Sequence, residues 1–336
     1  MSGETDFSYA KAGVNVATIR QMQKKINKSI ASTKNEFSMP VYGHYAGMFK
    51  AGKNTLAVHC DGVGSKVLVA QELGKYDTVG IDAIAMNVND MVCIGAQPAV
   101  CVDYIALERQ DDVLVSELMK GLIKGAKYSN CAIVGGETAI MPDVIKGIQD
   151  KTGFDLAVTC VGFVKGRLIT GKDLRKGDVL VGLEASGIHS NGYTLARRLL
   201  PADEWGEKML TPTRIYVKQV LEMIGKTNVH GIAHITGGAF SKLTRIGRQA
   251  RVGFVLDSMP RAPEIFQEMG RKVNDEREMY RTFNMGVGMV IAVDKNEAET
   301  IIGIARKNGT RASVIGEVVP KQGVILEKQG KKIRLT

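Results

Sequence analysis

The 336-residue sequence has few aromatic side chains and no cysteine pair at metal-binding spacing. Aromatic residues make up 6% of the chain, so the stacking platforms that hold single-stranded nucleic acids are scarce. The five cysteines lie in apolar runs and none belongs to a Cys-x-x-Cys pair, which argues against a zinc site and predicts buried, reduced thiols. These cysteines are Cys60, Cys93, Cys101, Cys131 and Cys160.

Long apolar runs are also absent. No stretch approaches the roughly 20 residues that are needed to cross a bilayer. The first ten residues, MSGETDFSYA, have neither the basic part nor the apolar part of a signal peptide. We therefore expect a globular cytoplasmic protein with no membrane partner.

The charge balance is basic, with 45 lysines and arginines against 35 acidic residues and a formal charge of +10. One interpretation is an anionic partner, either a nucleic acid or a small phosphorylated substrate. A lysine-rich soluble surface without such a partner is equally compatible with the composition. Because the basic residues are scattered, apart from a cluster at residues 328–334, a nucleic acid is the weaker alternative and is not expected.

The length predicts two domains, because one ordinary core rarely serves so long a chain. Apolar strand patterns alternate with helical patterns in both halves, which is typical of the α/β class. The stretch 165–178 is rich in glycine and charge and is the best linker in the chain. We therefore predict one domain at residues 1–168 and a second at residues 169–336.

A six-residue motif follows the apolar run at residues 55–60, which we expect to be a strand. Its acidic, glycine, hydroxyl and basic residues are Asp61, Gly62, Gly64, Ser65 and Lys66. Glycines let the backbone approach an anion closely, a lysine supplies a positive point charge, and a carboxylate can hold magnesium. The motif thus has the composition of a phosphate site.

The next segment, residues 82–93, has a helical period with one apolar face. Asp82, Asn89 and Asp90 fall together on the opposite side of this predicted helix. Two carboxylates and an amide could ligate magnesium or position phosphates, but a polar stripe opposite a core stripe is also typical of a solvated face. Both interpretations are open from the spacing.

Glycine-rich turns follow three further strands. Glu137 comes after a predicted strand at 131–134 and the pair Gly135-Gly136, as a metal or substrate ligand or as a carboxylate at a helix N-terminus. The turn at 184–192 precedes a helix and contains His189, Ser190 and Asn191; it is either a phosphate-binding turn or a long capping turn.

The third turn, Thr236-Gly237-Gly238, follows His234, which is either a functional group or a structural histidine. A fourth small-residue loop, residues 43–49, precedes the first confident strand. It is either a lid that contacts a nucleotide or an ordinary turn.

Seven motifs occur in the order of one known family. They are DGVGSK at 61–66, GIDAIAMNVNDMVCIGAQP at 80–98, GGETAIMP at 135–142, SGIHSNGY at 186–193, PTRIYVK at 212–218, HITGGAF at 234–240 and RTFNMGVGM at 281–289. Together they resemble the phosphoribosylformylglycinamidine cyclo-ligases, also called aminoimidazole ribonucleotide synthetases, over residues 41–320. DGVGSK alone is similar to loops in selenophosphate synthetase, thiamine-monophosphate kinase and a hydrogenase maturation factor, whereas PTRIYVK, HITGG and RTFNMG are specific.

The chain departs from the family pattern at a few positions. Ile188 stands where a proline is usual, and Ala239 stands where a glycine is usual. The segments 12–16 and 43–47 also differ from the common pattern. The chain therefore resembles a divergent, archaeal-type member.

The resemblance implies a function in purine biosynthesis. The expected reaction is ATP-dependent cyclisation of formylglycinamidine ribonucleotide to 5-aminoimidazole ribonucleotide, through an iminophosphate, with release of ADP and phosphate. It also implies a homodimer, in which N-terminal strands of two subunits close a barrel beside a C-terminal α/β domain, with ATP near the N-terminal strands.

The resemblance also implies roles for the candidate residues. Mg²⁺ and the triphosphate are expected at Asp61, Asp82 and Asp90, with Glu137 as a further ligand. Lys66 is expected to neutralise phosphate charge and Asn89 to orient it. His234 is expected either to transfer a proton or to stabilise an oxyanion. The nucleotide and substrate phosphates are expected at Gly62, Gly64, Ser65, His189, Ser190, Asn191, Thr236, Gly237 and Gly238.

Two rival functions come from other classes. One is another ATP-using enzyme of the same superfamily, either a small-molecule kinase or a selenophosphate synthetase. The selenium enzyme is disfavoured because its reactive N-terminal Cys or Sec has no counterpart here, where the first cysteine is Cys60. The other rival, suggested only by the charge, is a non-catalytic nucleic-acid-binding protein.

Overall fold

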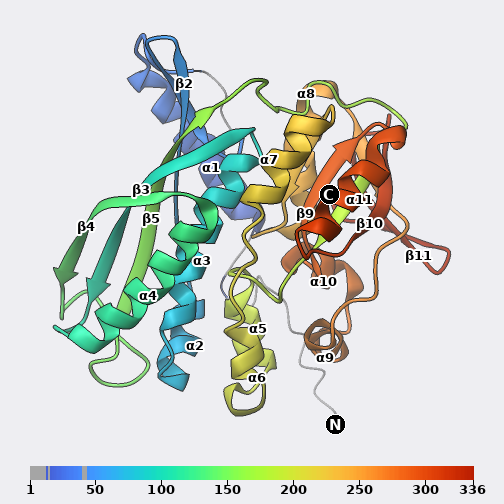
Figure 1. Ribbon diagram of the computed structural model, residues 1–336. Coiled ribbons are helices and arrows are strands. Elements are labelled where there is room, and N and C mark those ends of the chain that lie inside the picture. The colour runs from blue at the N-terminus through green and yellow to red at the C-terminus, as the bar shows by residue number, and fades with distance from the viewer. Residues whose placement is uncertain (1–12, 14–15, 40–43) are drawn as a thin grey trace.

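Each half of the chain builds its own mixed β-sheet. The computed structural model describes residue 13 and residues 16–39 and 44–336. The first sheet has the strand order β1-β2-β5-β3-β4, and the second has the order β12-β11-β8-β10-β6-β9-β7. The predicted two-domain α/β organisation is thus confirmed (Figure 1). The boundary between residues 168 and 169 stays a prediction.

The first half contains α1 (Val16–Ile30), η1 (Ala31–Thr33), β1 (Gly47–Ala51), β2 (Asn54–Gly62), α2 (Lys66–Leu73), α3 (Asp77–Val92), β3 (Ala96–Leu107), α4 (Asp112–Ser129), β4 (Ala132–Ile140) and β5 (Phe154–Val164). Strands β3 and β4 are parallel, and the other neighbouring strands of this sheet are antiparallel.

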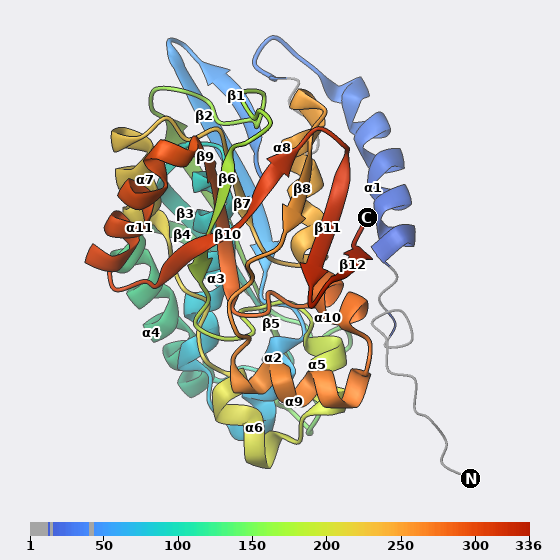
Figure 2. The same cartoon turned by 90° about the vertical axis from the view of Figure 1, so that its right-hand side faces the viewer.

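The second half begins with β6 (Val179–Glu184), α5 (Tyr193–Leu199), α6 (Ala202–Met209), α7 (Val217–Lys226), β7 (Gly231–His234), η2 (Ala239–Lys242), α8 (Leu243–Ala250) and β8 (Gly253–Leu256). It continues with α9 (Glu264–Val273), α10 (Glu276–Thr282), β9 (Val287–Val293), η3 (Lys295–Glu297), α11 (Ala298–Lys307), β10 (Ala312–Val319), β11 (Gly323–Lys328) and β12 (Lys331–Arg334). Figure 2 looks across the second sheet, with α7 and α11 on one side and α8 on the other.

The first sheet is covered on one face only. Helices α3 and α4 pack together on that face, and they approach closely at two glycines. A Cβ at Gly80 would lie 2.3 Å from the carbonyl oxygen of Leu118, and one at Gly121 would lie 2.0 Å from that of Asp77. The other face exposes apolar side chains, among them Val102, Tyr104, Val134 and Phe163.

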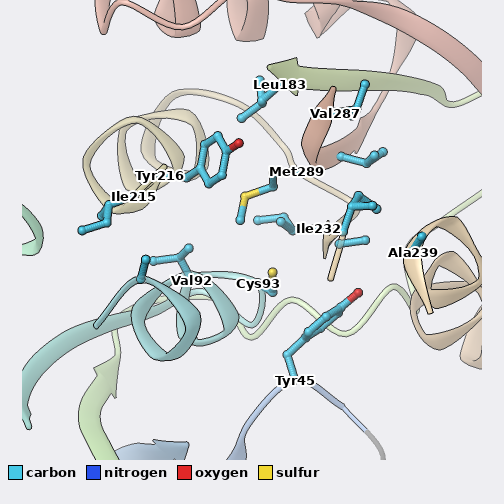
Figure 3. Close-up of a cluster of buried hydrophobic side chains, with 14 of the residues drawn as sticks. Tyr45, Val92, Cys93, Leu183, Ile215, Tyr216, Ile232, Ala239, Val287 and Met289 are labelled. Atoms are coloured by element: carbon cyan, nitrogen blue, oxygen red, sulfur yellow. The ribbon is translucent and has the colours of Figure 1, made fainter. Parts of the chain in front are cut away.

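The buried core continues from one half into the other. Strand β9 is buried at every residue, because helices cover both faces of the second sheet, and its sequence VGMVIAV is correspondingly an unbroken apolar run. Figure 3 shows Tyr45, Val92 and Cys93 of the first half facing Ile232 and Met289 of the second. Helix α3, which also contacts α7 and β7, therefore forms the wall between the two domains.

The strand predicted to end at Val134 extends to Ile140. The pair Gly135-Gly136 belongs to the strand because β4 lies close to β3: a Cβ at Gly136 would lie 2.5 Å from Oδ1 of Asp103. The glycines therefore mark a close approach between strands. The prediction that a turn follows these glycines was wrong.

One other expectation, that every cysteine is buried, needs correction, and two further segments are now placed. Residues 212–216 are not helical, and α7 begins only at Val217. Cys60 is exposed on the open sheet face, whereas the other four cysteines are buried as predicted. The basic cluster at 328–334 forms the end of the β11–β12 hairpin.

No helix within the described ranges is long and apolar enough to cross a membrane. Of the predicted loop at 43–49, residue 43 lies outside the described residues, as do residues 12, 14 and 15 of the divergent N-terminal segment. Residues 44–46 precede β1, whereas residues 47–49, which were expected in the loop, already belong to this strand.

Candidate active site

The polar stripe of α3 faces the second domain. Asp82, Asn89 and Asp90 are all buried, so the interpretation as a solvated face was wrong. Burial of two carboxylates and an amide is costly unless each finds a partner. All three find these partners across the domain boundary.

Asp82 forms a buried ion pair with Lys66. Lys66 Nζ lies 2.7 Å from Asp82 Oδ2 and donates hydrogen bonds to the carbonyl oxygens of His189 (3.0 Å) and Thr211 (2.8 Å). Asp82 Oδ1 accepts from the backbone N–H (2.8 Å) and the hydroxyl (2.5 Å) of Thr213. Burial lowers the pKa of Lys66 and raises that of Asp82, and the contact between their charges opposes both shifts. Both side chains therefore hold the domains together.

Asn89 fixes the segment that precedes α7. Its Nδ2 donates to the carbonyl oxygen of Arg214 at 2.8 Å, and its Oδ1 accepts from the N–H of Tyr216 at 2.9 Å. This amide satisfies the backbone of a segment that has no regular secondary structure. Residues 212–216 of the PTRIYVK motif thus pack against α3.

Asp90 lies between two histidines from different domains. Its Oδ1 is 2.7 Å from Nδ1 of His234, at the end of β7, and its Oδ2 is 3.4 Å from Nε2 of His59, on β2. Burial favours protonation of Asp90, but hydrogen bonds from His234 and His59 outweigh burial and hold the pKa of the carboxyl well below its ordinary value. The ionised Asp90 accepts from Nδ1–H of His234, which leaves Nε2 as the acceptor of that ring.

Asp61 lies near Asp90 at the end of β2. Burial, followed by the charge of Asp90, raises the pKa of the Asp61 carboxyl above its ordinary value. Its Oδ1 accepts from the N–H of Gly62 at 2.9 Å. Two neighbouring carboxylates, one of which disfavours ionisation of the other, are a donor set that suits a hard divalent cation.

The three predicted metal ligands do not gather at one point. Asp82 and Asp90 are eight residues apart on α3, a rise of about 12 Å. Among the described residues, no three His, Cys, Asp or Glu side chains are arranged to hold a metal ion. Asp61 and Asp90 are the two acids that the structure brings together.

The turn at 186–192 packs onto the Asp61–Lys66 motif. Ser190 Oγ donates to the carbonyl oxygen of Val63 at 2.7 Å, and Ser65 Oγ lies 3.2 Å from Oγ1 of Thr194. Asn191 Nδ2 is 3.8 Å from the sulfur of Met86. The two predicted phosphate loops are therefore in contact across the domain boundary.

His189 lies inside this turn and is buried, with a positive φ of 69°. Its Nε2 accepts from the N–H of Ser186 at 3.2 Å. Burial, followed by the charges of His234 and Lys66, lowers the pKa of His189 well below its ordinary value. His189 is thus a neutral residue that supports the turn.

The turn at Thr236–Gly238 lies directly after His234. Gly238 has a positive φ of 85°, which only glycine adopts without strain, and it begins η2. Lys242 donates to the hydroxyl of Thr236. This hydrogen bond stabilises the turn from its C-terminal side.

Glu137 stands apart from these groups. It lies on β4, in register with Tyr104, and three strand spacings, about 14 Å, separate its row from Gly62. Its side chain is exposed. The alternative of a carboxylate at a helix N-terminus was wrong, because this stretch is a strand.

Sequence reasoning missed His59, Tyr45, Lys242 and Arg245. His59 could have been found, because it precedes Asp61 by two residues in a strand and therefore shares its face. Tyr45 is buried at the domain boundary, where burial raises the pKa of its hydroxyl. Lys242 and Arg245 lie near its ring. No local pattern marks these two basic residues.

Two family models match the chain. The AIR synthase related protein N-terminal domain matches residues 21–164, and the corresponding C-terminal domain matches residues 175–329. These ranges correspond to the two sheets.

Curated relatives match over nearly the whole chain. A phosphoribosylformylglycinamidine cyclo-ligase of Methanocaldococcus jannaschii is 44% identical over 344 residues, covering 97% of this chain and 95% of that protein. The protein of the same name from Pyrococcus furiosus is 42% identical over 341 residues, covering 97% and 99%.

Solved structures share the fold at low identity. Thiamine monophosphate kinase of Aquifex aeolicus has a TM-score of 0.66 at 18% identity, covering 95% of this chain and 99% of that one. The hydrogenase maturation protein HypE of E. coli has a TM-score of 0.63 at 19% identity, covering 84% and 85%. At these identities the likeness concerns the fold alone.

Proposed function

The chain belongs to the phosphoribosylformylglycinamidine cyclo-ligase family, and from this premise we propose that it closes the imidazole ring of a purine precursor. It is an ATP-dependent ligase that converts formylglycinamidine ribonucleotide to 5-aminoimidazole ribonucleotide, ADP and phosphate. The observation within the structure that best supports the reaction is the Asp90–His234 contact beside Asp61, at the domain boundary.

The chemistry explains why ATP is required. An amide carbonyl is a poor electrophile, and its oxygen is a poor leaving group. Transfer of the γ-phosphoryl group to that oxygen forms an iminophosphate and releases ADP. The amidine nitrogen then attacks the activated carbon, the C–O bond breaks, phosphate leaves with the oxygen, and the nitrogen loses a proton. The protein must position the groups and neutralise charge.

His234 is the proton-transfer residue. Asp90 holds its Nδ1–H, so Nε2 is the basic atom, and the imidazolium formed on protonation is stabilised by the carboxylate. The His234 side chain is fully buried. Contact with the substrate therefore requires that a neighbouring segment be displaced when the ligand binds.

Asp61 and Asp90 are the carboxylates that would hold Mg²⁺. Bound there, the ion would neutralise phosphate charge during phosphoryl transfer. Asp82 and Lys66 fix the two domains relative to each other. They form an ion pair, and each also forms hydrogen bonds with the backbone of the second domain. Asn89 has the same role toward the 212–216 segment.

The phosphates of ATP and of the ribonucleotide bind at the facing turns. Backbone N–H groups at glycine turns that precede helices suit anions. The turns comprise Gly62, Gly64, Ser65, His189, Ser190, Asn191, Thr236, Gly237 and Gly238.

The active form is a homodimer joined through the open face of the first sheet. The support is the exposed apolar surface of β3, β4 and β5, which includes Val102, Tyr104 and Phe163. In a barrel closed by two such sheets, Glu137 would serve the site across the subunit interface. The protein acts in the cytoplasm, and neither a membrane nor a nucleic acid takes part.

An assay of ADP and phosphate release with ATP and formylglycinamidine ribonucleotide tests the function. We expect stoichiometric ADP, phosphate and aminoimidazole ribonucleotide. Thiamine monophosphate serves as the control substrate, because a kinase of the same fold would phosphorylate it without releasing phosphate. If the ribonucleotide elicits no ADP, the proposed function is rejected.

A further inference from the structure

Two cations of the second domain project toward one aromatic ring of the first. Lys242 Nζ lies 6.0 Å from the centre of the Tyr45 ring, and the Arg245 guanidinium carbon lies 5.3 Å from it. Lys242 is the last residue of η2 and immediately precedes α8. Arg245 lies three residues later on α8, so both residues lie on the same side of this continuous helical segment. The pair sits directly after the Thr236-Gly237-Gly238 turn.

Neither cation has a carboxylate partner in an ion pair within the part of the chain that the structure describes. Lys242 donates to the Thr236 hydroxyl. It lies in the fields of Asp90 and Asp61, but no carboxylate oxygen of either is within 4.0 Å of it. Burial lowers the pKa of Lys242 to about 8, against the attraction of Asp90, with the charge of Arg245 adding to the decrease. A half-buried ammonium group without an ionic partner carries a desolvation cost, and a bound anion would relieve that cost.

The lysine that the sequence assigns to this task is not available for it. Lys66 is completely buried and is already bound by Asp82 and by two carbonyl oxygens. To reach a phosphate, it would have to abandon three contacts, two of which join the domains. Lys242 would give up only a hydroxyl.

We propose that Lys242 and Arg245 are the cations that bind the triphosphate of ATP, facing Asp61 and Asp90 across the domain boundary. The proposal rests on the proposed function and deepens it. Lysine and arginine bind phosphate oxygens by charge-assisted hydrogen bonds, and the flanking Thr-Gly-Gly turn adds backbone N–H groups.

The position favours the triphosphate over the 5′-phosphate of the ribonucleotide. A triphosphate carries Mg²⁺ with it, and Asp61 and Asp90 are the paired carboxylates that suit this ion. Lys242 interacts with both acids. A cation close to two ion-binding carboxylates matches the charge pattern of a metal–triphosphate complex.

The test compares Lys242→Met and Arg245→Met with Lys226→Met. Lys226 is an exposed lysine on α7, paired with Glu222, and serves as the matched control. Affinity for an ATP analogue with a β,γ-methylene bridge is measured by calorimetry in the presence of Mg²⁺ without ribonucleotide. KM values for ATP and for the ribonucleotide are measured separately.

We expect each of the two site variants to weaken analogue binding and raise KM for ATP by roughly 10- to 100-fold, the size of a lost charge-assisted hydrogen bond. KM for the ribonucleotide and the behaviour of Lys226→Met should stay within twofold of wild type. Lys242→Arg should recover most of the affinity.

Two outcomes would overturn the proposal. Unchanged analogue affinity in both site variants would remove these residues from the triphosphate site. An increase confined to KM for the ribonucleotide would assign them to its phosphate instead. Thermal unfolding verifies that each variant is folded. If Lys242→Met is not folded, the analogue affinity of Arg245→Met alone tests the proposal. Wild-type protein that releases no ADP would instead refute the proposed function, so the two failures are distinguishable.

Discussion

Asp90 is the residue on which the two domains converge, because a histidine from each domain contacts one of its oxygens. We predict that Asp90→Asn lowers kcat by about 10²- to 10⁴-fold, the usual contribution of a positioned acid–base group. An amide can present its N–H₂ to Nδ1 of His234 and thereby favour the wrong tautomer. The rate of ADP release measures the loss, and Asp143→Asn, at an exposed position, should retain wild-type activity. A kcat within threefold of wild type would contradict the role given to the pair.

Asp61 offers a sharper test of magnesium binding. Asp61→Asn should abolish turnover while leaving the circular dichroism spectrum and the melting temperature close to those of wild type. The reason is that, among the described residues, its carboxylate accepts only a short-range hydrogen bond, from the N–H of Gly62. Near-normal activity would defeat the assignment of this residue to the metal.

The lowered pKa of Lys242 predicts that the free energy of unfolding depends on pH. Its pKa in the folded protein is about 8, below the ordinary value of 10.5. Between these values the unfolded chain binds a proton that the folded chain does not, so the free energy of unfolding rises with pH in this window.

Compared with Lys242→Met, wild-type protein should gain about 1–3 kcal/mol between pH 8 and pH 10.5. Urea unfolding of both proteins at several pH values measures the gain. If the difference between them does not vary with pH, Lys242 does not titrate as described.

At the scale of elements, the close crossing of α3 and α4 controls where the site residues lie. Gly121→Ala would place a methyl group against the carbonyl oxygen of Asp77, and α3 would have to move. We predict a loss of about 2–3 kcal/mol of unfolding free energy and a fall in activity.

Gly303→Ala, on α11, is the control for that substitution, because a Cβ there meets nothing within 4 Å. It should be neutral or stabilising by up to about 1 kcal/mol. If the two substitutions changed the free energy of unfolding in denaturant equally, helix propensity and not the close crossing of α3 and α4 would determine the effect on stability.

Local patterns predicted most elements but not their partners. The apolar period of 82–93 predicted α3, because burial on one face leaves a periodic record, and the apolar run before Asp61 predicted β2. The glycines at 135–136 were misread because a glycine in a turn and a glycine at a close strand contact look alike in one sequence. The polar stripe of α3 could be assigned to neither solvent nor a site, since its partners in the second domain lie more than 120 residues away along the chain.

At the scale of the whole molecule, the open face of the first sheet predicts the oligomeric state. Tyr104→Glu places a charge in the centre of this face and should give a particle of one chain mass, 36.4 kDa, where wild type gives twice that mass. Sedimentation velocity distinguishes the two.

Val113→Glu is the control for the dimer. Val113 is 75% exposed but lies on α4, which covers the opposite face of the sheet, so its substitution should leave the dimer intact. A wild-type protein that sediments as a single chain would rule out the barrel.

The buried stripe of α3 also has a consequence for synthesis on the ribosome. The first sheet is complete at Val164, whereas Thr213 and His234, which bind Asp82 and Asp90, follow 49 and 70 residues later. At 5–20 residues per second, these acids spend roughly 2 to 14 seconds as hydrated surface groups. The water that hydrates Asp82 and Asp90 must be removed as the second half of the chain docks. Docking of the nascent domains therefore requires desolvation of these two acids. A translational pause between residues 164 and 234 would prolong the lifetime of a partly synthesised chain whose site residues are still hydrated.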